Sequence, residues 1–157
     1  MKAALAAALL VVGVAAPARA DITGFLGATT TPANRAVRGA AVGAGLLIVG
    51  FEVEYAYTPD DPAANAPALT TGSGNALLQT PFEIFGFQPY VTGGVGFFRE
   101  TLGLHQETNL AVNTGAGIKL TLVGPLRLRV DYRVFKLGGD ALASPAHRIY
   151  AGLNLKF

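Results

Sequence analysis

The chain has 157 residues, enough for one domain of ordinary size; 51% of them are hydrophobic and 14% are charged. This composition excludes a disordered chain, and the absence of cysteine excludes disulfides, thiolate metal sites and cysteine catalysis. Two of the twelve basic residues, Lys2 and Arg19, lie in a predicted leader, and the remaining ten balance ten acidic residues. The balanced charge gives no electrostatic case for a nucleic-acid partner.

Residues 1–20 have the pattern of a secretory signal peptide. Lys2 supplies the positive start, a long uncharged apolar run follows, and Ala18 and Ala20 fit the small-x-small cleavage rule. We therefore expect export and cleavage before Asp21. An uncleaved anchor helix is the alternative, but the apolar run is shorter than the ~20 residues that a spanning helix needs.

The rest of the chain, 21–157, alternates between segments suited to strands and segments rich in turn residues. The expected strands, in chain order, are 22–30, 36–44, 49–57, 75–80, 89–99, 108–122, 126–135 and 147–157. The expected loops at 31–35, 58–74, 100–107 and 136–146 would share the end opposite the termini. We predict one all-β domain, an eight-stranded antiparallel up-and-down barrel that crosses a membrane.

The segment 126–135 carries the clearest pattern. Its apolar positions share one parity and its charged positions share the other, so a strand has one apolar face and one charged face. The apolar set is Leu126, Leu128, Val130, Tyr132 and Val134, and the charged set is Arg127, Arg129, Asp131 and Arg133. A membrane barrel explains both faces, with lipid outside and a polar interior. A soluble lipocalin-like barrel, with its apolar face inward, is the alternative.

Glu52 and Glu54 lie on one face of the strand expected at 49–57. An eight-stranded barrel leaves an interior that side chains just fill, so each buried charge there needs a partner. We predict an interior charge network of Glu52, Glu54, Lys119, Arg127, Arg129, Asp131, Arg133 and Arg148. A narrow polar conduit and acid–base catalysis by the paired carboxylates are the alternatives.

His105 and His147 fall in or beside expected loops, near several carboxylates. Histidine and carboxylates could bind a metal or support hydrolysis. Neither Ser73 nor Ser144 lies in a Gly-x-Ser-x-Gly motif, and we interpret both histidines as solvated rim residues. We expect no catalytic residue, metal site or cofactor.

Three Gly-x-Gly pairs, at 43–45, 94–96 and 115–117, begin like a dinucleotide-binding fingerprint. The third glycine is missing each time and no helix follows, so a nucleotide site is not indicated. Glycine on these strands would instead let the barrel bend and its crowded interior close.

The chain resembles the small eight-stranded outer-membrane barrels of the OmpA-like superfamily. The likeness rests on the Pro-Tyr strand with glycines at 89–96, on the hairpin formed by 115–119 and 126–135, and on the last strand. Tyr150, Gly152, Leu155 and Phe157 fit the polar-x-Gly-x-x-apolar-x-apolar signal that such proteins present to the barrel-assembly machinery. The chain departs from the family in lacking tryptophan, so any aromatic girdle would rest on tyrosine and phenylalanine.

The resemblance implies a monomer in the bacterial outer membrane, in contact with lipopolysaccharide, that has an envelope-integrity or surface-interaction role and no open pore. A narrow channel for small solutes and a lipid-modifying enzyme of the barrel rim remain the functional alternatives.

Overall fold

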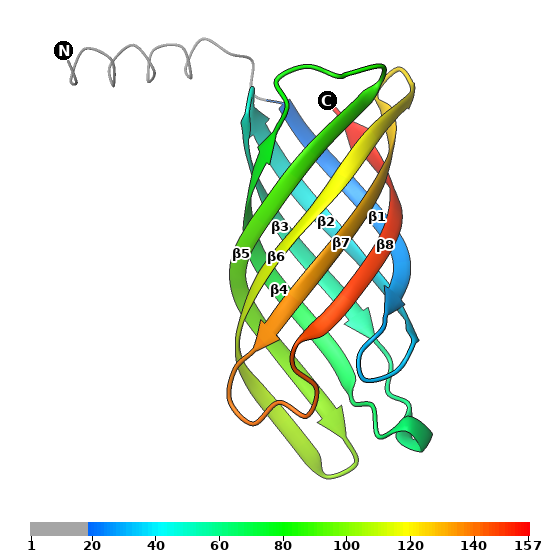
Figure 1. Cartoon of the computed structure of the whole chain (residues 1–157), viewed down its shortest axis with the longest axis vertical. Helices are drawn as coiled ribbons and strands as arrows, with labels where there is room; N and C mark the ends of the chain where they lie inside the picture. The colour runs from blue at the N-terminus through cyan, green and yellow to red at the C-terminus, as the bar shows by residue number, and fades with distance from the viewer. Residues whose placement is uncertain (1–18) are drawn as a thin grey trace, which may run out of the picture.

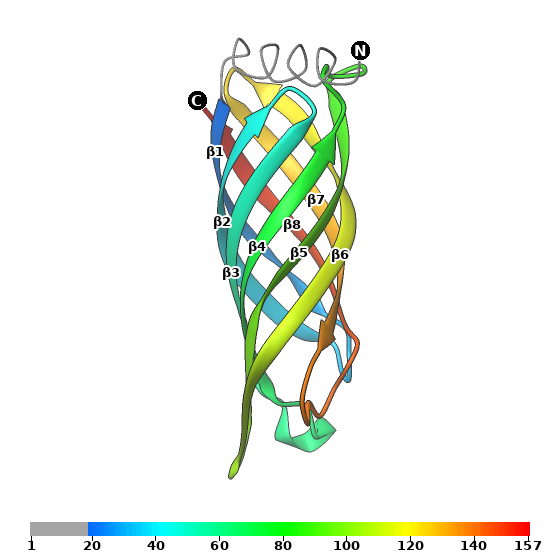
Figure 2. The ribbon, with the colours of Figure 1, turned by 90° about the vertical axis from the view of Figure 1, so that its left-hand side faces the viewer.

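The computed structural model describes residues 19–157, which form a closed antiparallel barrel of eight strands in sequence order (Figures 1 and 2). The strands are β1 (Arg19–Thr29), β2 (Arg35–Leu46), β3 (Val49–Thr58), β4 (Ala68–Gln79), β5 (Phe87–Leu102), β6 (His105–Val123), β7 (Leu126–Leu137) and β8 (Ala146–Lys156). The predicted fold class is therefore confirmed. A single 3₁₀ turn, η1 (Pro62–Ala64), interrupts the described residues.

The predicted signal peptide falls almost wholly on residues 1–18, which lie outside the described residues. Strand β1 begins at Arg19, two residues before the expected start of the processed chain. Among residues 19–157, no helix is long and apolar enough to span a membrane.

The start of β1 and the end of β8 lie at the same end of the molecule (Figure 1). Strand β1 pairs with β8 along its length, and the backbone N–H of Ala20 donates to the carbonyl of Phe157 at 2.9 Å. We call this the terminal end, and the opposite end, which carries the connections after β1, β3, β5 and β7, the loop end. Closure of β1 on β8 leaves no open sheet edge along the wall.

Alternation along each strand separates an apolar exterior from a mixed interior. On β3, Phe51, Val53 and Tyr55 face outward and are more than half exposed, whereas Glu52 and Glu54 face inward and are 4% and 1% exposed. This arrangement is the reverse of a soluble barrel, in which the apolar face would be the buried one. The lipocalin-like alternative is wrong for this reason.

Strand β4 begins at Ala68, so the predicted loop 58–74 is too long and the predicted strand 75–80 too short. The extra segment is rich in threonine, serine and glycine, which read as a loop. A neighbouring strand stabilises this segment in the extended conformation. Gly72 pairs with Phe97 of β5, and the Phe97 ring lies 2.7 Å from the position that a Cβ on Gly72 would take. The aromatic side chain covers the glycine and stabilises the strand there.

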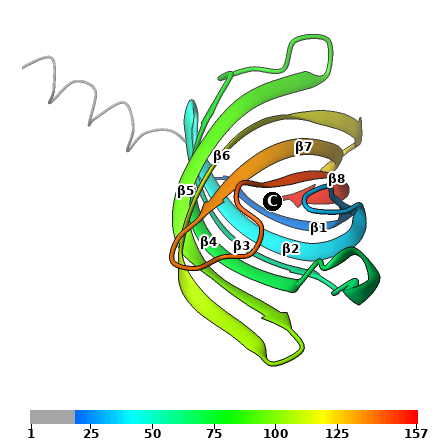
Figure 3. The ribbon, with the colours of Figure 1, turned by 60° about the horizontal axis from the view of Figure 1, so that its bottom comes forward.

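The predicted loop 100–107 is also wrong, because β5 and β6 continue as a ladder to the pair Leu102–His105. Gly103 and Leu104 alone make the turn, and Gly103 has a φ of 58°, which glycine adopts without strain. The resulting hairpin projects beyond the rest of the barrel (Figure 3). At the terminal end, the connection 80–86 is longer than this turn, so loop length alone does not distinguish the two ends.

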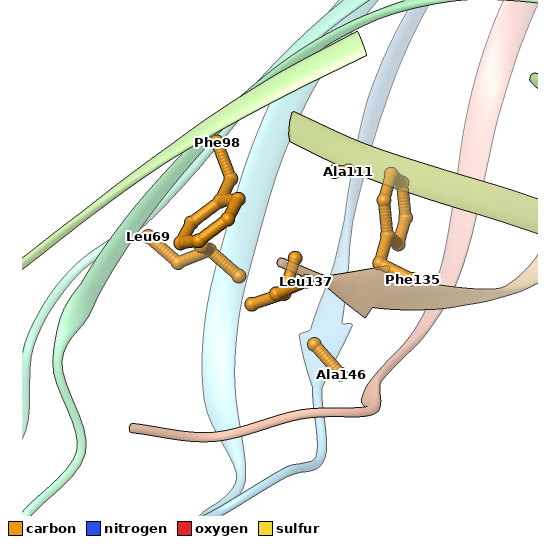
Figure 4. Packing of buried hydrophobic residues seen from close by; sticks show 6 residues of the cluster. All are labelled: Leu69, Phe98, Ala111, Phe135, Leu137 and Ala146. Carbon is orange, nitrogen blue, oxygen red and sulfur yellow. The ribbon is translucent and has the colours of Figure 1, made fainter. Parts of the chain in front are cut away.

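The loop-end part of the interior contains an apolar cluster. Six buried side chains from five strands pack together there (Figure 4). They are Leu69, Phe98, Ala111, Phe135, Leu137 and Ala146. These side chains fill the interior on the loop-end side of the charged residues described next.

Candidate functional site in the barrel interior

The central interior holds three arginines and three carboxylates brought together from β3, β7 and β8. We call this set the central network: Arg129, Arg133, Arg148, Glu52, Glu54 and Asp131. Every one of these side chains is at most 4% exposed. Their charges cancel, which matters because an unpaired charge in a dry interior costs several kcal/mol.

Arg129 and Arg133 both form ion pairs with Glu52 across the barrel. Arg129 pairs with Glu52 through Nη1, and Arg133 Nη2 donates to Glu52 Oε1 at 2.8 Å. Both arginines also bond Asp131, two residues from each on the same face of β7, at 3.1 Å and 2.9 Å. The guanidinium fork allows each arginine to hold two carboxylates at once.

Glu54 forms the second half of the central network. It accepts from Arg148 at 3.0 Å, lies 3.2 Å from Arg133 Nη1, and accepts the hydroxyl of Tyr150 at 3.2 Å. Arg148 also donates to the Thr71 hydroxyl at 3.0 Å. These contacts tie β3, β4, β7 and β8 together across the lumen.

Tyr90 of β5 completes the network by donating to Asp131 and accepting from Arg129 Nε at 2.7 Å. The space for its ring comes from β6, where a Cβ on Gly117 would lie 2.4 Å from the Tyr90 hydroxyl. Gly115 similarly makes room for Arg133, whose Cγ would be 2.8 Å from an added Cβ. The Gly-x-Gly pair at 115–117 thus lets large polar side chains fill the interior.

A second polar group lies at the terminal end. Lys119 bonds Asp21 at 2.9 Å, and Arg127 lies 3.7 Å from the same carboxylate. Arg127 also donates to Asn154 at 3.0 Å and to Gln88 at 2.9 Å. The predicted residues Lys119 and Arg127 therefore belong to this group and not to the central network.

His147 and Ser144 bond to different groups. His147 Nδ1 is 2.7 Å from the Tyr132 hydroxyl on the outer wall, whereas the Ser144 hydroxyl bonds the backbone of Leu137. His105 is at the tip of the projecting hairpin. In the part of the chain that the structure describes, no three His, Asp or Glu side chains come close enough to hold a metal ion.

Sequence reasoning did not single out the residues that fix the loops at the loop end. Buried Glu100 accepts the backbone N–H of Leu142 at 2.8 Å, which draws the β7–β8 connection over the lumen. Arg35, 6% exposed, donates to the carbonyls of Pro59 and Pro67 and so holds the β3–β4 connection. Alternation along β2 and β5 places both side chains on the inner face, and this alternation is the sequence feature that could have identified them.

Comparison with solved structures identifies the architecture. The barrel is similar to the N-terminal barrel domain of OprF from Pseudomonas aeruginosa, with a TM-score of 0.67 and 18% identity over 88% of this chain and 97% of that one. It is also similar to Neisserial surface protein A, with a TM-score of 0.65 and 17% identity over 89% and 96% of the two chains. The chain has the fold of the small eight-stranded outer-membrane barrels.

This outer-membrane barrel fold also includes an enzyme. The outer-membrane enzyme PagL matches with a TM-score of 0.54 and 15% identity over 87% of this chain and 98% of that one. No protein-family model matches the chain, and no curated protein matches its sequence. At these identities the comparisons establish the fold, and function has to be argued from the residues.

Proposed function

We propose that the chain is an integral outer-membrane barrel, monomeric and without an open pore, that supports the envelope and presents its loop end to the surroundings. The observation that carries this proposal is the reversed distribution of side chains, with apolar residues outside and a charge-balanced network sealed inside. An exterior of this kind is stable in lipid and would aggregate in water.

The outward face also supports a direction for the barrel. Near the loop end it carries the exposed basic residues Arg38, Arg99 and Lys136, whereas the turns of the terminal end expose Phe82 and Phe85. Aromatic rings suit the boundary between hydrocarbon and headgroups, and cations suit a phosphate-rich leaflet such as lipopolysaccharide. We place the terminal end in the periplasm and the loop end outside.

In this proposal, the N-terminal segment directs export and the last strand directs assembly. Residues 1–20 would direct export and be removed before Asp21. Leu155 faces outward on β8 and Phe157, just after the strand, is exposed, while Tyr150 and Gly152 face inward. This strand would carry the signal that the barrel-assembly machinery reads.

A rim enzyme is the second candidate, because PagL shares the fold and is an enzyme. The geometry gives it little support. Ser144 bonds backbone and His147 bonds Tyr132, so the two side chains do not form a nucleophile–base pair. We therefore infer a structural or surface-interaction role and no catalytic one.

Single-channel recording on the purified barrel in planar bilayers tests the closed interior against the transport alternative. We expect no ion conductance, because the central network and the apolar cluster at the loop end fill the lumen. Stepwise, reproducible conductance would contradict the proposal and favour a narrow channel. A variant with Arg133 and Glu52 both changed to alanine serves as a comparison, since it removes one ion pair from the central network.

A further inference from the structure

The terminal end of the barrel contains a hollow of about 130 Å³ beneath the central network. We call it the terminal hollow. It is walled on one side by the glycines of β2 and β3: a Cβ on Gly43 would lie 3.0 Å from Asp21 Oδ1, and one on Gly45 would lie 3.2 Å from Gln79 Nε2. Because a cavity of ~10–15 Å³ admits one water, this space admits a small polyatomic ion with part of its hydration.

Basic side chains predominate around the terminal hollow. Arg19, Lys119, Arg127 and Lys156 line it, against the carboxylates of Asp21 and Glu52. Glu52 is already bonded to Arg129 and Arg133, so Asp21 is the one lining acid left to balance these four cations. Within residues 19–157 the adjacent Glu83 forms no ion pair and accepts a hydrogen bond from Thr121, although its charge offsets part of that of Arg127 and Lys156.

Three of the four cations do not depend on where the chain is processed. If residues 1–20 are removed, Arg19 is lost and a new α-ammonium forms at Asp21. Lys119, Arg127 and Lys156 lie on β6, β7 and β8 and are unaffected.

Two of these cations are buried and still have donors available. Lys119 and Arg127 are each 4% exposed. Arg127 uses Nε and Nη1 for Asn154 and Gln88, while its Nη2 lies 3.7 Å from Asp21, beyond hydrogen-bond distance. Lys119 donates one of its three N–H groups to Asp21. Their free donors face the hollow, where either water or an anion can accept from them, and an anion would also offset the positive charge.

We propose that the terminal hollow is a binding site for a small multivalent oxyanion, namely a phosphate or a phosphate monoester. Arg127 and Lys119 would contact the anion from the wall, and Lys156 with the cation at the start of β1 would contact it from the mouth. The phosphate could be a free ion or the headgroup of a lipid in the adjacent leaflet, and the two sources share this chemistry.

Titration calorimetry on the protein refolded in zwitterionic detergent, with inorganic phosphate as the probe, tests the site. We expect saturable binding at millimolar phosphate that weakens as salt is added. The Lys156→Gln variant should bind about three- to tenfold more weakly, and Asp21→Asn should bind more tightly by a similar factor, since each changes one charge beside the ligand. Lys136→Gln, which removes the same charge from the outer wall near the loop end, is the matched control and should not change binding.

A second arm separates the sources. The barrel is placed in phosphatidylcholine vesicles with or without phosphatidic acid, and protection of Lys156 from amine labelling is measured. Protection by inorganic phosphate supports a free ion, and protection by phosphatidic acid alone supports a lipid headgroup. Saturable binding in neither arm, or equal binding by Lys156→Gln and the parent in a correctly folded barrel, would overturn the proposal.

Discussion

Single side chains in this barrel act in pairs across the lumen, and their parity on the strand determines whether they face lipid or one another. Alternation in the sequence assigns Glu52, Glu54 and the arginines of β7 to one face, which is where the structure has them. It could not give the partners, because Glu52 and Arg133 are 81 positions apart and meet only when β3 and β7 close on opposite sides of the lumen. For the same reason, Tyr90 and Asp21 were not predicted to bond the interior charges.

The Glu52→Ala variant tests the importance of the pairing. Removing this carboxylate leaves Arg129 and Arg133 buried with one acid fewer between them. Breaking a buried ion pair from one side destabilises a protein by about 3–5 kcal/mol, so the folded form should convert to the unfolded form at a distinctly lower temperature on a heat-modifiable gel. Glu83→Ala, on an exposed turn, is the control and should change stability by less than about 1 kcal/mol. Equal melting of Glu52→Ala and the parent would show that the network does not stabilise the fold.

We predict that position 117 requires glycine because a larger residue would collide with its neighbours in the interior. In Gly117→Ala, the new Cβ would stand 2.4 Å from the Tyr90 hydroxyl and 2.5 Å from the Val130 carbonyl, so the ring or the strand must shift. Overpacking of this kind costs about 1–3 kcal/mol, measurable as a lower urea midpoint for refolding into detergent. Gly74→Ala is the matched control, because nothing lies within 4 Å of the added atom. If both variants refold like the parent, the crowding of the interior is less than the geometry indicates.

At the level of strands, the sequence predicts well where lipid imposes alternation and poorly where it does not. Strands β3, β7 and β8 were located to within two residues at each end because apolar and polar positions alternate without a break. The β5–β6 hairpin continues past the apolar part of the barrel, where outward Arg99, Thr101 and Gln106 lie beyond the acyl chains. Such residues read as a loop, although the backbone ladder is intact.

The tip of this hairpin is expected to tolerate insertion. Leu104 is fully exposed, and Gly103 and Leu104 form no barrel contact that an added segment would break. A short epitope placed between them should leave heat-modifiable folding intact and bind antibody on whole cells. The same epitope placed between Gly124 and Pro125, in a terminal-end turn, should bind antibody only after the outer membrane is opened. The reverse pattern would show that the barrel is inserted in the opposite direction.

For the whole molecule, stability depends on the solvation of the exterior by acyl chains. The fold and the inward charges follow from one arrangement, in which about half of each strand faces lipid and the other half builds a closed, charge-balanced lumen. The sequence predicts that arrangement, whereas the terminal hollow is lined by residues from distant strands and is seen only in the structure.

The chain contains no tryptophan, so one introduced tryptophan gives an unambiguous signal for the surroundings of the outer wall. Val53 is 70% exposed in the middle of β3, and Leu104 at the hairpin tip is fully exposed. The most direct measurement is quenching of tryptophan fluorescence by lipids brominated in mid-chain, on Val53→Trp and Leu104→Trp barrels in vesicles. We predict strong quenching and blue-shifted emission for Val53→Trp and little quenching for Leu104→Trp. Water-like, unquenched emission from Val53→Trp in a folded barrel would contradict the membrane-spanning arrangement.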